Sequence, residues 1–108
     1  MGFQASEVAL EAAVMLAGVL EVVKTKEAEL ADQMKRACMS MVLNVPEGGR
    51  RGGKDRGYHF RIAAGSAAEL RNALRLAIAW KYCPPQDELL ALLDRELAML
   101  WRLEHPRI

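Results

Sequence analysis

Hydroxyl and carboxylate side chains of the kind that perform hydrolytic chemistry occur together between residues 36 and 69 of this 108-residue chain. Ser40 could serve as a nucleophile, and Glu47 or Glu69 as a general acid or base. A serine nucleophile needs a base within hydrogen-bonding reach, however, and His59 is the only histidine in this region. We therefore expect no catalytic centre here. The sequence indicates a protein that is not an enzyme and holds neither a metal nor another cofactor.

A glycine-rich loop that could bind phosphate lies in the same region. Residues 48–55 read GGRRGGKD, which matches the G-x-x-x-x-G-K portion of the P-loop of nucleotide-hydrolysing proteins. Asp55 stands where a P-loop has the Ser or Thr that binds magnesium, and its carboxylate would repel phosphate. The preceding segment has a helical pattern, whereas a P-loop follows a strand. The sequence therefore argues against a nucleotide site.

The same loop carries a concentration of positive charge. Residues 33–82 contain ten Lys or Arg against three acidic residues, although the whole chain has a net charge of only +1. Five of these cations lie within twelve positions: Arg50, Arg51, Lys54, Arg56 and Arg61. We interpret this cluster as a contact surface for the phosphates of RNA or DNA, with Tyr58 and Phe60 available to stack on bases. The alternative is a solvated loop at one end of the molecule, with Phe60 in the core.

Helices must position these residues, because the chain is rich in aliphatic residues and alanine and has no strand-forming run. The pattern predicts one all-α domain over residues 1–108. The predicted helices cover residues of about 6–23, 26–47, 54–82 and 85–103. Gly48 and Gly49 should end the second helix, and Pro46 should distort its last turn. The short connections predict an antiparallel up-down-up-down four-helix bundle.

Polar residues fall on one face of the second and third predicted helices. Those on the second helix are spaced by four, four and three positions: Arg36, Ser40, Asn44 and Glu47. In a hairpin of antiparallel helices, facing positions have nearly constant index sums, so Ser40 should lie against Ser66. By the same rule, Arg36 should pair with Glu69. We expect a structural network that fixes the register of the two helices, comprising Arg36, Ser40, Asn44, Glu47, Ser66 and Glu69.

Apolar side chains are more numerous on the first and last predicted helices than a monomeric bundle needs to bury. We therefore expect homo-oligomerisation; the alternative is a well-buried bundle with some surface leucines. The longest apolar run, residues 12–20, is too short to span a bilayer, so no membrane association is expected. Cys38 and Cys83 are isolated thiols, which favours a reduced, cytoplasmic protein.

Motifs on the second and third predicted helices are similar to those of a known bacterial family. The family pattern is Gln-x-x-Arg-Ala-x-x-Ser, Asn-x-x-Glu-Gly, a short Gly/Arg loop, and then Ala-x-Gly-Ser-x-x-Glu-Leu. The matching residues are Gln33, Arg36, Ala37, Ser40, Asn44, Glu47, Gly48, Ala63, Gly65, Ser66, Glu69 and Leu70. On these residues the chain resembles the 23S rRNA intervening-sequence proteins, a four-helix-bundle family that includes the accessory variability proteins of diversity-generating retroelements. Pro46 departs from the pattern, in which a small helix former usually stands.

The resemblance implies a four-helix bundle that assembles as a homopentamer and has no known catalytic activity. Retroelement members of the family bind a reverse transcriptase, and they bind nucleic acid through basic surfaces. We therefore expect an oligomeric nucleic-acid-binding or ribonucleoprotein accessory protein that uses the basic loop between the second and third helices. The alternative is a scaffold that binds a protein partner, for example a reverse transcriptase, and has no direct nucleic-acid role.

Overall fold

Four α-helices make up the fold of this protein, of which the computed structural model describes the backbone of residues 2–106 and the side chains of residues 4–106. The helices are α1 Gly2–Val23, α2 Ala28–Arg50, α3 Gly53–Ala79 and α4 Asp87–Glu104. No strand occurs in this described part of the chain. The prediction of an all-α fold is therefore confirmed.

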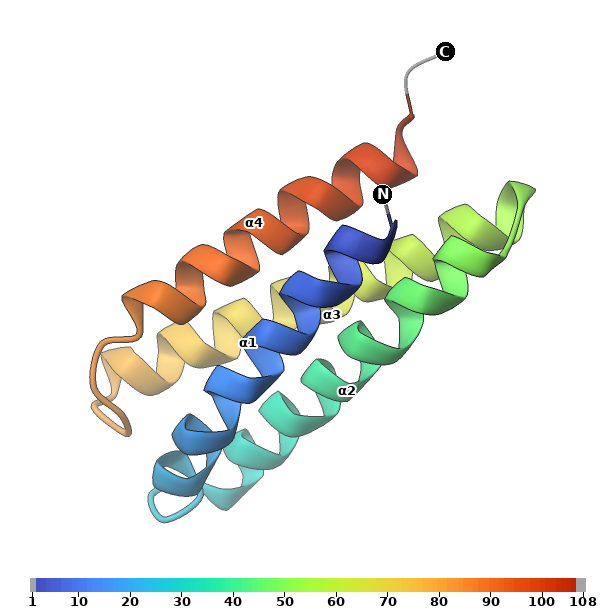
Figure 1. The fold of residues 1–108 in the computed structure, drawn as a ribbon. Coiled ribbons are helices and arrows are strands. Elements are labelled where there is room, and N and C mark those ends of the chain that lie inside the picture. Colours follow the sequence, from blue (N-terminus) through green and yellow to red (C-terminus); the bar gives the residue numbers. More distant parts are fainter. Residues whose placement is uncertain (1, 107–108) are drawn as a thin grey trace.

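The helices lie lengthwise beside one another in a molecule of 46 × 21 × 18 Å (Figure 1). α2 packs against both α1 and α3, and α4 packs against the same two helices. The connection between α2 and α3 lies at one end of the molecule, whereas the α1–α2 and α3–α4 connections lie at the other end (Figure 1). The basic loop therefore lies at the end where α1 begins and α4 ends, away from the other two connections (Figure 1).

Two clusters of buried apolar side chains form the core. The larger cluster includes Leu16 of α1, Leu70 of α3 and Leu93 of α4. The smaller cluster, nearer the basic loop, is built around Phe60, Val45 and Leu100. Two buried polar residues lie at the boundary between the clusters, Ser66 on α3 and Glu96 on α4.

The end of α2 differs from the prediction. The helix passes through Pro46 and both glycines and ends at Arg50, beyond the predicted end at residue 47. Pro46 removes one backbone donor, but the final turn is held in place because Gly48 packs against the buried ring of Phe60. A Cβ added to Gly48 would lie 2.5 Å from Phe60 Cε1. The glycine that was predicted to stop the helix is therefore a site of close packing between α2 and α3.

The other helix ends shift by a few residues. α1 begins at Gly2 rather than near residue 6, and α2 begins at Ala28 rather than near residue 26. α3 ends at Ala79 rather than near residue 82, because a turn with Lys81 at φ 62° reverses the chain there. α4 begins at Asp87 rather than at residue 85.

The structure also bears on the membrane and the cysteines. Within residues 2–106, no helix combines the length and the apolar character needed to cross a bilayer. Cys38 and Cys83 are both free and buried, and burial raises the pKa of each thiol. Neither thiol is therefore suited to act as a nucleophile at neutral pH.

Candidate nucleic-acid interface

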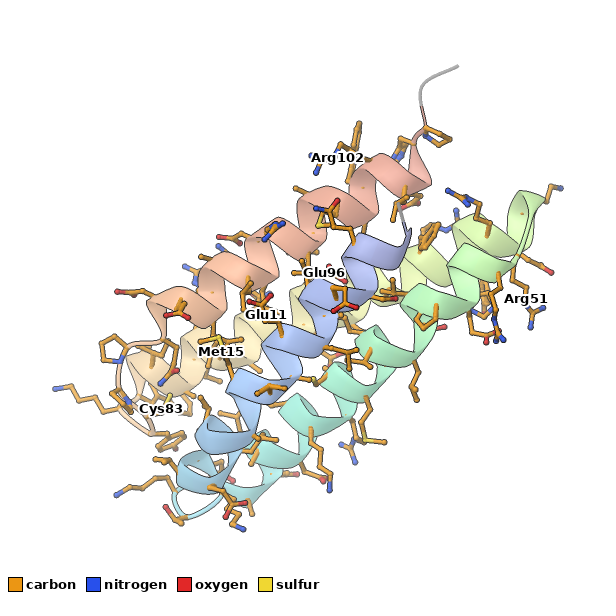
Figure 2. The ribbon with its side chains drawn as sticks, viewed as in Figure 1. Glu11, Met15, Arg51, Cys83, Glu96 and Arg102 are labelled. Atoms are coloured by element: carbon orange, nitrogen blue, oxygen red, sulfur yellow. The ribbon has the colours of Figure 1, made fainter. Side chains whose placement is uncertain are left out.

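The five predicted cationic residues gather toward the end of the molecule where α2 meets α3. Arg50 closes α2, Arg51 follows in the connection and Lys54 lies in the first turn of α3; all three are exposed. Arg56 is half-buried, and Arg61, one to two turns further along α3, is exposed. Figure 2 shows Arg51 at this end, with its side chain outside the ribbon. We call these five residues the basic cluster.

Glu47 holds the two consecutive arginines of the basic cluster. Its Oε2 accepts a hydrogen bond from Arg50 Nη2, and its Oε1 accepts one from Arg51 Nη2 at 3.2 Å. These hydrogen bonds, that of Arg50 first, lower the pKa of the Glu47 carboxyl below its ordinary value. Arg51 Nη1 also lies 3.8 Å from Asp55 Oδ2. Glu47 therefore orders the basic loop and takes no part in the helix–helix network to which the sequence assigned it.

Of the two aromatic residues expected to stack on bases, one is accessible. Phe60 has no exposed surface and belongs to the smaller core cluster, so the expectation that it stacks on a base is wrong. The guanidinium carbon of Arg56 lies 5.1 Å from the centre of the Phe60 ring, a cation–π distance. Tyr58 remains exposed beside the basic cluster, and its ring packs nearly perpendicular to that of His59 at a centroid separation of 5.4 Å.

The start of α3 adds a second source of positive potential. Gly52, at the capping position, provides no side-chain hydrogen bond, and Gly53 has φ 59°, a left-handed conformation that favours glycine. The first N–H groups of α3 therefore have no capping side chain, and the helix dipole places partial positive charge there. Lys54 lies beside these groups and forms no ion pair within residues 4–106. Asp55 in the same turn offsets part of this potential.

Arg61 is engaged by α4. Its Nη1 lies 3.5 Å from Oε2 of Glu104, although the Arg61 side chain remains largely exposed. This ion pair joins the C-terminal turn of α4 to the basic end of α3. Arg61 is therefore partly neutralised, as Arg50 and Arg51 are by Glu47; Lys54 and Arg56 are the members of the basic cluster that form no ion pair within residues 4–106.

A chain of hydrogen bonds links α2 to α3 just inside the basic cluster. Ser66 Oγ donates to Ser40 Oγ at 2.7 Å, so the structure brings these two serines together. Asn44 Nδ2 donates to the Ser40 carbonyl oxygen at 2.9 Å and lies 3.4 Å from Ser40 Oγ. Asn44 Oδ1 lies 2.9 Å from His59 Nδ1, so the imidazole donates to it when Nδ1 carries the proton. The chain crosses between the helices at two levels and fixes their register.

His59 is the member of this hydrogen-bond chain that sequence reasoning missed. A single histidine beside a basic loop carries no periodic signal that separates a solvated residue from a partner in a network. The index rule for facing positions gives no such signal either, because it places His59 opposite Glu47, almost one turn away from Asn44.

The predicted pair between Arg36 and Glu69 does not form. Arg36 Nη1 donates to Asp32 Oδ2 at 2.9 Å, one turn earlier on α2. Glu69 is exposed on α3 and lies in the groove between α2 and α3. A partner on the same helix requires less ordering of two long side chains than a partner on a neighbouring helix. Of the predicted network, the structure joins Ser40, Asn44 and Ser66, and it leaves out Arg36, Glu47 and Glu69.

Glu96 is the carboxyl with the most perturbed environment in the described part of the chain. Burial raises its pKa to about 7, a value typical of general acids and bases. Glu96 has no exposed surface, however, and among residues 4–106 neither of its oxygens has a hydrogen-bond partner. A substrate cannot reach it, so Glu96 is a buried core residue. Within residues 4–106, no three His, Cys, Asp or Glu are placed to hold a metal ion.

Comparison with known families decides the affiliation of the chain. The sequence model of the 23S rRNA-intervening sequence protein family matches residues 4–102, which is nearly the whole chain. The chain belongs to this family. The match includes the motifs on α2 and α3 and extends over α1 and most of α4. Neither the curated proteins nor the solved structures yield a match.

The basic end of the molecule offers several groups that can bind an anion. Arg50, Arg51 and Lys54 offer exposed donors, and the start of α3 adds backbone N–H groups. The hydroxyls of Ser40 and Ser66 bond to each other, and within residues 4–106 neither hydroxyl forms a hydrogen bond with a histidine or a carboxylate. The arrangement therefore fits recognition of a phosphate backbone.

Proposed function

We propose that this protein binds nucleic acid through the basic cluster, as a non-enzymatic ribonucleoprotein accessory protein of the cytoplasm. The observation that carries the proposal is the grouping of five cationic residues at the end of the molecule where α2 meets α3, with Arg50, Arg51 and Lys54 exposed beside the uncapped start of α3. Arginine and lysine release the counterions condensed on phosphates, and a helix N-terminus favours an anion. Membership in a family named for 23S rRNA intervening sequences agrees with an RNA ligand.

The proposal includes assembly of an antiparallel up-down-up-down bundle into a homopentamer. The contacts of Ser40 with Ser66 and of Gly48 with Phe60 support the antiparallel course of α2 and α3. Exposed apolar side chains support association with further subunits, but they lie on α1 and α2 rather than on the first and last helices as predicted; Trp101 is the one strongly exposed large apolar residue of α4 within residues 4–106. A ring of copies would present the basic cluster repeatedly on one face, and this repetition would multiply the phosphate contacts.

The binding test uses fluorescently labelled single-stranded RNA and DNA, with anisotropy measured at low ionic strength. A variant in which Arg50 and Arg51 are both replaced by alanine should lose roughly tenfold or more in affinity, because fewer counterions are released. The matched control replaces Lys24 and Lys26, exposed cations at the opposite end, and should bind like the wild type. If the wild type binds neither RNA nor DNA at low salt, the proposal is wrong.

A second candidate function is a scaffold for a protein partner, for example a reverse transcriptase, as for the retroelement accessory proteins of the family. Exposed apolar residues such as Val14 on α1 and Trp101 on α4 favour a protein contact. Under this function, a complex with the purified partner should survive nuclease treatment and replacement of Arg50 and Arg51. Loss of the complex under either treatment would instead favour the nucleic-acid-binding function.

A further inference from the structure

Tyr58, on the outer face of α3, presents an aromatic ring among the cations of the basic cluster. The residue is 55% exposed, whereas Phe60, two positions later, is buried in the core. Lys54 lies one turn before Tyr58 and Arg61 lies about one turn after it, and spacings of four and three residues place all three on one face of the helix. Both flanking cations are exposed. The ring therefore lies between two positively charged side chains along α3.

Two acidic residues lie near this face, and each of them is paired with an arginine. Asp55 Oδ2 is 3.8 Å from Arg51 Nη1. Glu104 Oε2 is 3.5 Å from Arg61 Nη1, and the Arg61 side chain nevertheless stays 60% exposed. Lys54 forms no ion pair within residues 4–106. The surroundings of the ring therefore keep an excess of positive charge, which suits an anionic ligand.

The orientation of the Tyr58 ring is restrained by the hydrogen-bond chain between α2 and α3. The ring packs against that of His59 at a centroid separation of 5.4 Å and an interplanar angle of 78°. His59 Nδ1 is in turn 2.9 Å from Asn44 Oδ1, and Asn44 is bonded to Ser40. A perpendicular contact covers at most one of the two faces of the Tyr58 ring. The ring is therefore oriented in advance and keeps a face for a planar ligand, which reduces the ordering that binding requires.

The two other strongly exposed aromatic residues within residues 4–106 lack this setting. Trp80 follows the last residue of α3, at the opposite end of that helix from the basic cluster, and packs perpendicular to Tyr82 at 6.0 Å. Trp101 on α4 is stacked on His105 at 4.3 Å, so its own chain covers one face of the indole. Tyr58 is therefore the exposed aromatic residue that the basic cluster surrounds.

We propose that Tyr58 stacks on an unpaired base of a strand whose phosphates contact Lys54 and Arg61, so that the basic end prefers single-stranded to double-stranded nucleic acid. This inference rests on the proposed binding function and adds the class of ligand to it. Every base has a π-face, so stacking on tyrosine tolerates any sequence. In a duplex the neighbouring base pairs cover these faces, and an exposed side chain reaches only the phosphates and groove edges.

The test measures anisotropy with the full-length chain and three labelled RNAs of equal length: a single strand, the same strand with abasic sites, and a duplex. Tyr58→Ala should bind the single strand roughly fivefold to a hundredfold more weakly than the wild type. It should bind the abasic strand and the duplex like the wild type. Tyr58→Phe keeps the ring and should bind every RNA like the wild type. Because stacking releases no counterion, Tyr58→Ala should also keep the wild-type salt dependence, unlike Arg50→Ala/Arg51→Ala.

The outcomes separate this inference from the proposed function. If the wild type binds the single strand and Tyr58→Ala binds it equally well, the stacking is wrong while the proposed function stands. Equal weakening on all three RNAs, or tighter binding of the duplex by the wild type, would also overturn the inference. If the wild type binds none of the RNAs, the proposed function fails first. Circular dichroism checks the fold, and Tyr58→Leu, which is apolar but has no ring, replaces Tyr58→Ala should that variant unfold.

Discussion

Glu96→Gln should flatten the fall in unfolding free energy that we expect between about pH 4.5 and 7. Burial raises the pKa of Glu96 from 4.5 to about 7, because its charged form would be desolvated with no partner to compensate. In the unfolded chain the carboxyl has lost its proton above about pH 4.5, whereas the folded protein holds the proton up to about pH 7. Stability is therefore greatest below this window and falls as the pH rises through it.

The expected magnitude follows from the pKa difference. One pKa unit corresponds to about 1.4 kcal/mol, so a rise from 4.5 to about 7 predicts a loss of roughly 3 kcal/mol across the window. Folded domains are stable by roughly 5–15 kcal/mol, so the loss is a large share of the total. Glutamine keeps the shape of the side chain and does not ionise in this range. The variant should therefore lack this contribution to the pH dependence.

The assay is urea unfolding followed by circular dichroism at about pH 4.5 and about pH 8. Protein concentration must be held fixed, because assembly would make the apparent stability depend on it. Relative to wild type, Glu96→Gln should gain roughly 3 kcal/mol between the two conditions. Glu88→Gln removes an exposed carboxyl of the same helix and should follow the wild type. If Glu96→Gln also changes in parallel with the wild type, the reasoning about the buried carboxyl is refuted.

Three further predictions concern the helix pair and the basic loop. Gly48→Ala should destabilise the protein by about 1–3 kcal/mol in urea unfolding, because the new Cβ would overlap the aromatic ring packed there; Gly49→Ala, which meets nothing within 4 Å, should not. Ser66→Ala and Ser40→Ala should each cost about 1 kcal/mol, and the double variant should cost less than their sum; additive costs would argue against the bond. Glu47→Gln should strengthen RNA binding in anisotropy measurements by weakening the hold on the two arginines; weaker or equal binding would show that this hold does not compete with phosphate.

Sequence periodicity was sufficient to predict the four helices and one contact between two of them. The four helices follow from the apolar stripes and the breakers, and the index rule placed Ser40 opposite Ser66 because two long helices joined by a short loop have little freedom of register. The same regularity failed at the end of α2. There the packing of Gly48 against Phe60 outweighs the local preference of glycine to end a helix.

Charged side chains were predicted less well, because several partners compete for each of them. Arg36 has Asp32 on its own helix as well as Glu69 across the groove, and the local partner prevails. Glu47 accepts hydrogen bonds from Arg50 and Arg51, whereas the sequence indicated these two arginines only as cations of a basic loop. The burial of Glu96 could have been predicted from the sequence, because Glu96 continues the apolar stripe of α4 that also contains Leu93. What the sequence could not show is that no side chain of residues 4–106 forms a hydrogen bond with it.

The most direct test of the central claim is the salt dependence of RNA binding by the wild type and by the Arg50→Ala/Arg51→Ala variant. For a single strand, each phosphate contact contributes roughly −0.7 to the slope of log K against log salt concentration. Removing two contacts should therefore make the slope shallower by roughly 1.4, while the Lys24→Ala/Lys26→Ala control keeps the wild-type slope. An equal slope for the wild type and the arginine variant would contradict the claim that the basic cluster is the nucleic-acid interface.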